Sequence, residues 1–449
     1  MGIGSIIFIL CFAGAALFFA KNVSKIRRNI LLGKDVDRND NSSERWKTMA
    51  RVALGQSKMV VRPVPGILHI LVYVGFVIIN AEVLEIILDG ITGTHRMFSG
   101  LGSLYFWLIN AFEFLAVLVM VSCAIFLVRR NIVHIKRFFN PEMKGWPTSD
   151  ANIILITEIA LMIAFLTMNA ADSVLMNTDV AALQEAHLGK YAIGFEGYFS
   201  FSQFLIPLLP DDLSTLMGIE RGMWWFHILG ILAFLNYLPY SKHFHILLAF
   251  PNTYFSNLKP KGQFTNMEAV TNEVKLMFDP EADPYAAPAP EEGDAVPQSF
   301  GAKDVTDLTW KQLMDAYSCT ECGRCTSNCP ANQTGKLLSP RKIMMDTRDR
   351  LEEVGKNIDK HGKDHDDGKS LLNDYITSEE LWACTSCNAC VQACPVNIDP
   401  LSIIMEMRRY LVMEQSAAPN ELNVMFTNIE NNGAPWQFAQ ADRLNWKNE

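Results

Sequence analysis

The sequence predicts an all-α protein in two parts, a five-helix transmembrane bundle and a soluble helical domain. Long apolar runs crowd the first 250 residues, whereas the last 200 are polar with an acidic balance. Eight of the ten cysteines lie in that polar part, in two copies of one spacing. The chain of 449 residues has room for roughly two or three domains. Its formal net charge of −9 gives no reason to expect a nucleic-acid partner.

Five apolar segments are long enough to cross a bilayer, which takes about 20 residues. They lie at residues 2–20, 64–88, 104–128, 152–176 and 222–248. The first segment lacks a basic region before its apolar run, and its positive charges follow that run at Lys21, Lys25, Arg27 and Arg28. This pattern favours a retained helix over a cleaved signal peptide.

The lysine and arginine counts of the loops predict the orientation of the bundle. Residues 21–63 carry eleven and residues 129–151 carry five, against one in 89–103 and two in 177–221. Because basic loops face the cytoplasm, we expect the N-terminus outside and the polar C-terminal part in the cytoplasm. A reducing compartment also suits a domain with many free thiols.

Histidines inside membrane spans are costly and usually functional. His69 and His245 both lie near the cytoplasmic ends of their spans, at a matched depth. His227 precedes His245 by 18 residues, which predicts that both project from the same face of one helix, about 27 Å apart. Two imidazoles on facing helices can clamp a b-type haem. We therefore pair His69 with His245, and His243 is the alternative ligand.

The outer half of the bundle leaves two interpretations open. His227 has no depth-matched histidine in another span, although His95 in the loop after the second span could fold back to complete a second haem site. Alternatively, His227 belongs to a quinone pocket in which Glu113 supplies a proton. Other polar groups on that side, each explained equally well by helix–helix contacts, are Asn80, Glu82, Asn169 and Asp172.

The stretch Leu238-Pro-Tyr-Ser-Lys-His-Phe-His245, preceded by His227, resembles the last helix of a known membrane protein. That protein is the cytochrome b (gamma) subunit of respiratory nitrate reductase, and five spans with the N-terminus outside are similar to it as well. The resemblance implies haem bound by the bundle. Two-haem members carry two histidines ten residues apart on the second span, whereas this chain has His69 and then Ile79.

The two cysteine runs share one spacing of four cysteines and a proline. They read Cys319-x-x-Cys322-x-x-Cys325-x-x-x-Cys329-Pro330 and Cys384-x-x-Cys387-x-x-Cys390-x-x-x-Cys394-Pro395. This run holds [4Fe-4S] clusters in two-cluster ferredoxins. Disulfides are the weaker alternative because the thiols are packed too closely for stapling, and structural zinc sites typically use two separated pairs of ligands.

In two-cluster ferredoxins the fourth cysteine of each run binds the other cluster. One cluster is therefore expected on Cys319, Cys322, Cys325 and Cys394. The other is expected on Cys384, Cys387, Cys390 and Cys329. Apolar residues at helical spacing precede the first run from Leu308 and follow the second from Leu401, which predicts an α-helical ferredoxin arrangement.

The expected domains are a bundle at residues 1–250, a linker at 251–302 and the two-cluster domain at 303–449. Proline and acidic residues without periodicity at 279–300 indicate an extended connector. Within 303–449, three stretches accompany the cysteine runs, namely Asp307-Leu-Thr-Trp-Lys-Gln-Leu, Met407-Arg-Arg-Tyr-Leu-Val and Asn431-Asn-Gly-Ala-Pro-Trp-Gln.

These stretches together resemble the dicluster module of the heterodisulfide reductase family. The module also occurs in membrane-bound oxidoreductases that link electron-transferring flavoprotein to menaquinone. The resemblance implies residence in a bacterial inner (cytoplasmic) membrane and a separate cytoplasmic subunit with a Cys-Cys-Gly domain, because no Cys-Cys-Gly occurs in this chain. Electron-transferring flavoprotein is a further partner that it implies.

We therefore expect a membrane-anchored conduit that exchanges electrons between a cytoplasmic partner, two [4Fe-4S] clusters, at least one b-type haem and (mena)quinone. Two other classes stay open. One is a redox sensor tethered to the membrane, and the other is an anchor subunit without quinone turnover.

Overall fold

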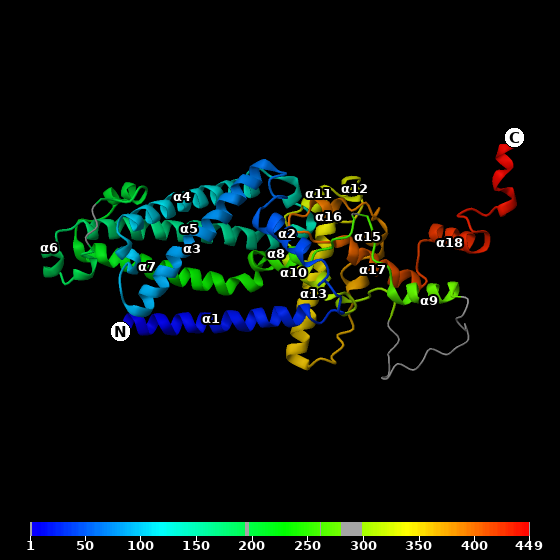
Figure 1. The fold of residues 1–449 in the computed structure, drawn as a ribbon, viewed down its shortest axis with the longest axis horizontal. Coiled ribbons are helices and arrows are strands. Elements are labelled where there is room, and N and C mark those ends of the chain that lie inside the picture. Colours follow the sequence, from blue (N-terminus) through cyan, green and yellow to red (C-terminus); the bar gives the residue numbers. More distant parts are fainter. Residues whose placement is uncertain (1, 194–196, 261, 280–298, 449) are drawn as a thin grey trace. The chain divides into compact units, whose positions relative to one another are not determined.

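The computed structural model describes residues 2–193, 197–260, 262–279 and 299–448. Within these ranges the chain forms helices, and its only β-structure is two isolated bridges (Figure 1). The predicted all-α class is confirmed. The chain divides into two compact units, and the first comprises Met1–Arg28, Asn41–Tyr254 and Tyr317–Gly323. The second comprises Asn29–Asp40, Phe255–Ala316 and Arg324–Glu449.

The first unit contains the long helices, and within it α3 packs on α4, α4 on α5 and α5 on α7 (Figure 1). By length and composition, α1, α3, α4 and α5 could each cross a membrane. The helices are α1 Ile3–Ile30, α2 Ser42–Met49, α3 Pro63–Thr92, α4 Ser103–Asn131, α5 Trp146–Met176, α6 Val180–Glu185, α7 Leu213–Tyr237 and α8 His245–Tyr254.

The segment expected as a fifth span, residues 222–248, is not one helix. Helix α7 ends at Tyr237, the short 3-10 turns η7 (Leu238–Tyr240) and η8 (Lys242–Phe244) follow, and α8 begins at His245. Pro239 has no N–H for the helical ladder. The prediction that His227 and His245 project from one face of a single helix is therefore wrong.

A buried carboxylate holds this bend in place. Asp150 on α5 accepts hydrogen bonds from the hydroxyl groups of Tyr237 (2.5 Å) and Ser241 (2.6 Å) and from the backbone N–H of Lys242 (3.1 Å). The Ser241 hydroxyl in turn accepts the backbone N–H of His243 at 3.1 Å. These bonds satisfy polar groups that the interrupted helix leaves without intrahelical partners.

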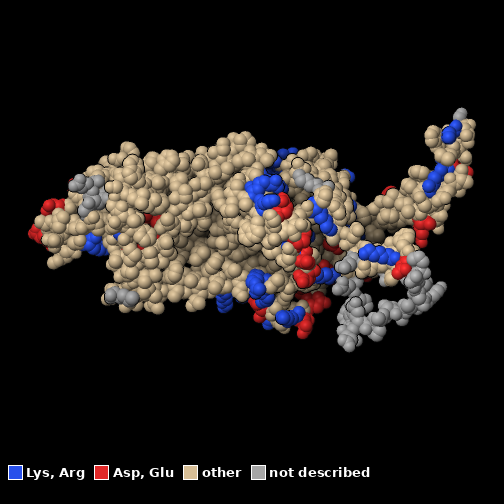
Figure 2. Space-filling model, viewed as in Figure 1, with Lys and Arg blue, Asp and Glu red and all other residues tan. Residues whose placement is uncertain are grey.

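The core of the bundle joins five helices through large apolar side chains. Phe8 of α1 is fully buried, and its ring centre lies 5.7 Å from that of Trp224 on α7. Gly90 of α3 makes room for this ring, because a Cβ atom there would lie 2.6 Å from Cδ1 of Phe8. Lys, Arg, Asp and Glu side chains are sparse along the middle of the bundle on the face that Figure 2 shows.

The second unit consists of shorter helices around the cysteine runs (Figure 1). Helix α10 precedes the first run and α17 follows the second, so both predicted flanking helices are confirmed. Of the expected linker, residues 261 and 280–298 lie outside the described residues, and the described part contains the end of α8 and the helix α9. The helices are α9 Glu268–Phe278, α10 Trp310–Ser318, α11 Arg324–Ser327, α12 Pro330–Gln333, α13 Pro340–His361, α14 Leu371–Asp374, α15 Ser378–Trp382, α16 Ala389–Ala393, α17 Pro400–Met413 and α18 Asn420–Asn432.

We predict opposite effects for one substitution at two helical glycines. Gly90→Ala should lower the free energy of unfolding by about 1–3 kcal/mol, because the new methyl group collides with the Phe8 ring. Gly222→Ala on α7 meets nothing within 4 Å and should gain up to about 1 kcal/mol from helix propensity. Thermal unfolding of the detergent-solubilised chain measures both, and equal midpoints for the two variants would contradict the packing of Phe8 on α3.

Candidate metal centres

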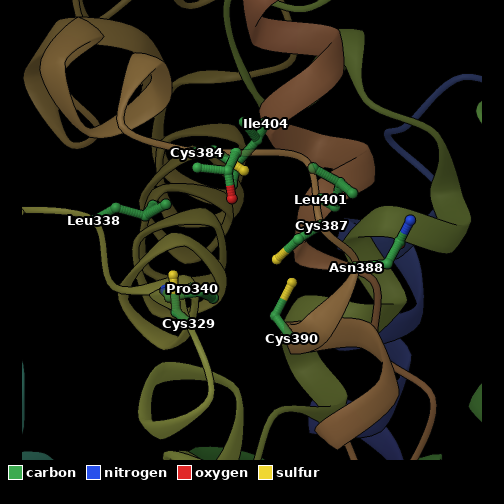
Figure 3. A pocket seen from close by; sticks show the side chains of 10 residues that line it. Cys329, Leu338, Pro340, Cys384, Cys387, Asn388, Cys390, Leu401 and Ile404 are labelled. Atoms are coloured by element: carbon green, nitrogen blue, oxygen red, sulfur yellow. The ribbon is translucent and has the colours of Figure 1, made fainter. Parts of the chain in front are cut away.

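Four thiols from the two cysteine runs line one cavity in the second unit. Cys329 comes from the first run, and Cys384, Cys387 and Cys390 come from the second. Figure 3 shows Cys387 and Cys390 on one side of the gap and Cys329 on the other. The apolar part of the lining is Leu338, Pro340, Leu401 and Ile404. Four convergent thiols in an apolar surround make the donor set that a [4Fe-4S] cluster requires.

The two runs adopt the same local backbone conformation. Glu321 and Ser386, each just before the second cysteine of its run, have φ values of 54° and 55°. Gly323 and Asn388, each just after that cysteine, have φ values of 69° and 58°. Side-chain-bearing residues rarely adopt this left-handed conformation, which costs of order 1 kcal/mol or more per residue. Its recurrence at equivalent positions indicates that both runs wrap the same kind of group.

Backbone N–H groups point at the sulfur atoms. The N–H of Ser386 lies 3.4 Å from Sγ of Cys384, and the N–H of Ile398 lies 3.3 Å from Sγ of Cys394. Such bonds stabilise thiolate charge and tune the potential of a bound cluster. Arg408 stacks on Trp382 and donates to the carbonyl oxygens of Leu381 and Cys384, which brings a positive charge to the same cavity.

The protonation of the free thiols follows from this environment. Burial raises the pKa of the Cys384 thiol, while the Ser386 N–H and the Arg408 charge act in the opposite direction. Burial also raises the pKa of Cys390, and the nearby Asp399 carboxylate adds to the effect. Both thiols are therefore protonated at neutral pH in the metal-free chain, and metal binding must release their protons.

The other expected cluster set stays a prediction. Cys319 and Cys322 belong to the first unit, and Cys325 and Cys394 belong to the second. Cys319 and Cys394 are buried, and Cys322 and Cys325 are partly exposed.

The structure brings His69 of α3 and His245 of α8 together. Their ring centres are 6.4 Å apart, and the ring planes are inclined by 45°. A metal–imidazole bond is about 2 Å long and the ring centre lies about 1 Å beyond the nitrogen, so two imidazoles on one iron have centres roughly 6 Å apart. The separation therefore fits two imidazoles that would hold one metal ion between them. His243 lies 5.6 Å from His245 and 5.3 Å from Phe234, measured between ring centres.

Lys242 connects this histidine pair to the first cysteine run. Its carbonyl oxygen lies 3.1 Å from Nδ1 of His245, which leaves Nε2 of that ring available to a metal. Its ammonium group forms an ion pair with Glu321, which lies between Cys319 and Cys322. Both ends of the pair are largely buried, at 9% and 3% exposure of the side chains.

The remaining predicted residues lie elsewhere in the bundle. His227 is 1% exposed, its Nδ1 has no hydrogen-bond partner, and its ring packs 5.9 Å from that of Phe165. No described contact joins it to His95. Nε2 of His95 lies 2.8 Å from Asp172, and Nδ1 faces Arg221 at 3.4 Å. We do not retain His95 as a haem ligand, because both of its ring nitrogens are engaged.

Glu113 is fully buried and fully hydrogen-bonded. Oε1 accepts the side-chain amide of Asn169 at 3.0 Å. Oε2 accepts the backbone N–H groups of Phe201 (2.8 Å) and Ser202 (3.0 Å). With both oxygens occupied by these three donors, the contacts of Glu113 suit the anchoring of the loop around residue 201.

Several residues at these sites escaped the reasoning from sequence. In the sequence, Lys242, Glu321 and Asp150 resemble ordinary charged residues of loops or helix ends. Only the bend after α7 brings them together. The acidic stripe at Glu82, Glu85 and Asp89 was detectable, because spacings of three and four residues place side chains on one helical face.

The comparisons with known proteins agree with the thiol geometry. A family model described as a 4Fe-4S dicluster domain matches residues 318–398. A probable iron–sulfur-binding oxidoreductase, FadF of Bacillus subtilis, is 27% identical over 99% of this chain and 61% of its own length. The EtfAB:quinone oxidoreductase of Syntrophomonas wolfei is 26% identical over 99% of this chain and 59% of its own length.

A shorter match covers only the cluster region. One component of a ferredoxin/F(420)H(2)-dependent CoB-CoM heterodisulfide reductase from Methanosarcina acetivorans is 34% identical over 26% of this chain and 60% of its own length. No solved structure matches the chain. The relatives are iron–sulfur oxidoreductases, and this chain carries a 4Fe-4S dicluster domain like theirs. It spans about three fifths of the length of its two long relatives.

We predict that Cys329→Ser, although it lies in the first run, will damage the cluster built mainly on the second run. One thiolate is lost from the cavity that Cys384, Cys387 and Cys390 line, so anaerobically purified protein should lose up to about half of its iron and one of two electron paramagnetic resonance signals.

Cys123→Ser is the matched control, because this buried cysteine lies on α4 outside both runs. The control should keep all its iron. Loss of the signal assigned to the first run's cluster in Cys329→Ser would contradict the exchange of fourth ligands.

Proposed function

We propose that this chain is a membrane-anchored electron-transfer subunit. It passes single electrons between a redox partner, two [4Fe-4S] clusters, a b-type haem and a quinone dissolved in the bilayer. A relative named EtfAB:quinone oxidoreductase supports quinone as one end of this path, and the flow can run in either direction. The four apolar helices support the membrane anchor.

One observation carries the proposal, namely the double role of Lys242. Its carbonyl oxygen orients His245 and its ammonium group holds the loop between Cys319 and Cys322. The candidate haem ligand and the first cysteine run thus share one buried residue. Electron transfer requires short distances between centres, and this arrangement supports a Cys319–Cys322 segment held close to the candidate haem ligand.

The chemistry of the side chains decides which residues would hold the clusters and which would hold the haem. Thiolates of the two runs would hold the clusters, with Cys319, Cys322, Cys325 and Cys394 on one and Cys384, Cys387, Cys390 and Cys329 on the other. His69 and His245 would hold the haem. When bound, these groups would exchange single electrons without covalent change to a substrate.

The remaining parts of the proposal rest on sequence and relatives. The charge asymmetry of the loops supports a bacterial inner membrane protein with its N-terminus outside and its cluster domain in the cytoplasm. Segments 251–302 and 303–449 then act as linker and cluster domain. A quinone pocket around His227 is supported by the unpartnered Nδ1 of that buried ring, and the same atom would equally suit a second haem.

Loss of the haem ligand tests the proposal directly. His245→Ala should abolish the b-type absorption band in a reduced-minus-oxidised spectrum, because one of two axial imidazoles is removed. His134→Ala, at an exposed loop histidine, should keep the band. A full band in His245→Ala would refute the pairing with His69. A complete absence of b-type haem in the wild-type protein would favour a tethered sensor or a plain anchor.

The ion pair at Lys242 generates a separate prediction. Lys242→Met retains the carbonyl that accepts from His245 but removes one half of the buried ion pair with Glu321, and breaking a buried pair from one side typically costs about 3–5 kcal/mol. We expect full haem content, a lower unfolding midpoint and slower reduction of the haem by the reduced clusters.

The double variant Lys242→Met/Glu321→Gln should recover part of the stability, because neither charge is then left alone. Stopped-flow spectroscopy and thermal unfolding measure the two effects. Additive losses in the double variant would show that the pair does not couple the two segments.

A further inference from the structure

A buried network of ionisable groups occupies the end of the bundle away from His69. Glu82 follows His69 by thirteen positions on α3, which corresponds to about 20 Å along the helix. The network combines five carboxylates with two guanidinium groups and one imidazole. Its members are Glu82, Glu85 and Asp89 of α3, His95 and Arg96 of the following loop, Asp172 of α5, and Glu220 and Arg221 of α7.

Arg96 is the centre of this network. It is 4% exposed, and it donates to Asp172 Oδ2 (2.7 Å), to Glu82 Oε1 (3.2 Å) and to the side-chain oxygen of Asn169 (2.6 Å). It also donates to the Tyr105 hydroxyl at 3.2 Å. One guanidinium therefore serves two carboxylates on different helices.

Four of the five carboxylates have donors for both oxygens. The Asp89 oxygens accept the Thr94 hydroxyl and backbone N–H groups. Glu85 accepts the N–H of Phe98 and the Tyr105 hydroxyl, both at 2.7 Å. The remaining two are Asp172, which is bound by Arg96 and His95, and Glu220, which is bound by Arg221 and Tyr191.

Glu82 is the exception. Its Oε1 meets only the long contact from Arg96, and its Oε2 is buried without a hydrogen-bond partner. The residue is 2% exposed. A buried carboxylate oxygen without a donor is strongly disfavoured in its charged form, whereas a carboxylic acid carries its own proton. Glu82 is therefore the one of the five acids that lacks a hydrogen-bond donor for one of its oxygens.

Charge balance leads to the same residue. Leaving the His95 ring aside, five ionised carboxylates against two guanidinium groups and the nearby Lys190 ammonium would leave two net negative charges. Such an excess in a low-dielectric bundle is costly, and the usual outcome is protonation of one or more acids. The carboxylate with the fewest hydrogen-bond donors, which is Glu82, is expected to take up the first proton.

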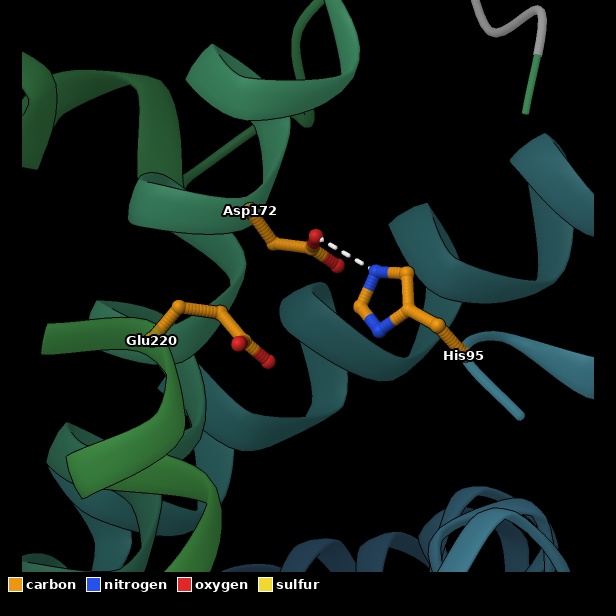
Figure 4. Close-up of side chains that lie close together, drawn as sticks. All are labelled: His95, Asp172 and Glu220. Atoms are coloured by element: carbon orange, nitrogen blue, oxygen red, sulfur yellow. Dashed lines mark hydrogen bonds and ion pairs between the residues drawn. The ribbon is translucent and has the colours of Figure 1, made fainter. Parts of the chain in front are cut away.

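A metal ion is the rival way to balance these charges. His95, Asp172 and Glu220 each offer a ligand atom within 4.8 Å of the others (Figure 4). However, Asp172 already binds Arg96 and His95, and Glu220 binds Arg221. Two guanidinium groups next to the three ligands repel a cation. The carboxylates are therefore paired by side chains of the protein, and the arrangement does not favour a metal ion.

A small cavity lies within the network and reaches its rim. Its lining includes Glu82, His95, Arg96, Asp172 and Arg221, and it leaves about 10 Å³ for a water-sized molecule. That volume is close to the minimum that one water needs, in a site with several polar partners. The side chain of Arg221 at the rim is 28% exposed, so water can exchange with the bulk on that side.

We propose that Glu82 is a proton-storage site, with the cavity water as its route to the rim at His95 and Arg221. The ligand is a proton, held on the carboxyl group and exchanged through one water molecule. The titratable and charged side chains that line the cavity with Glu82 are Glu85, Asp89, His95, Arg96, Asp172, Glu220 and Arg221.

The use of the stored proton rests on the proposed function. Reduction of a quinone to a quinol takes two electrons and two protons. Glu82 would supply one of these protons: its O–H bond breaks, an O–H bond forms on the quinone oxygen, and cavity water returns a proton from the rim. In the opposite direction Glu82 takes the proton that quinol oxidation releases.

Infrared spectroscopy of the full-length protein tests the site without reference to activity. The oxidised wild type should show a carboxylic C=O band that shifts in D₂O and disappears in Glu82→Gln. Glu82→Asp, which keeps an acid at this position, should retain the band at a shifted frequency. Glu113→Gln is the matched control, since it removes a buried carboxyl group outside the network whose oxygens both have donors, and it should leave the Glu82 band in place.

Each outcome decides the proposal. Persistence of the full band in Glu82→Gln, or its loss in Glu113→Gln alone, overturns the assignment to Glu82. If Glu82→Gln does not fold, an unshifted band in Glu82→Asp overturns it as well. A band at Glu82 in a protein without haem or quinone reduction would leave the proton site standing and refute the proposed function, so the two failures are distinguishable.

Discussion

The bend after α7 depends on one carboxylate, Asp150, and the arrangement of the candidate haem site depends on that bend. A continuous helix through residue 245 would aim His245 along the same line as His227. Asp150 instead binds the Tyr237 and Ser241 hydroxyls and the Lys242 N–H, and it thereby fixes the start of α8. The carbonyl of Lys242 can then accept from His245, and its side chain can reach Glu321.

The two ends of the bundle accommodate polar groups in different ways. At the end with His69 and His245, two imidazole rings face each other and a backbone carbonyl fixes the orientation of one ring. At the other end, Arg96 lies among acids from α3 and α5, and the donors are almost completely matched to acceptors. The first arrangement suits a ligand that binds between rings. The second suits an exchangeable proton, because a single unmatched oxygen remains.

Sequence alone predicted the helical class, the apolar helices α1, α3, α4 and α5, and the helices flanking the cysteine runs. These features follow from local composition and periodicity, which act over a few turns. The same reasoning failed between residues 222 and 248, because the apolar run there conceals a break that Pro239 begins and Asp150 on another helix stabilises. Tertiary hydrogen bonds of this kind leave no periodic signal in the chain.

The candidate sites follow the same division. The spacing of the cysteines is a local pattern, and the gathering of Cys329 with Cys384, Cys387 and Cys390 agrees with the set expected from it. His69 and His245 were paired by depth alone, and they do face each other. Lys242, Arg96 and Glu321 became relevant only in three dimensions, because each acts through a partner that is distant in sequence.

The mixed origin of the thiol cavity has a consequence for biosynthesis. Three of its sulfur atoms belong to a later part of the chain than Cys329, so a ribosome that has just released the first run exposes a thiol whose companions do not yet exist. A cluster on these four thiols would be loaded only after the second run has emerged and folded back. A nascent chain interrupted between the two runs would therefore present unligated, oxidisable cysteines to the cell.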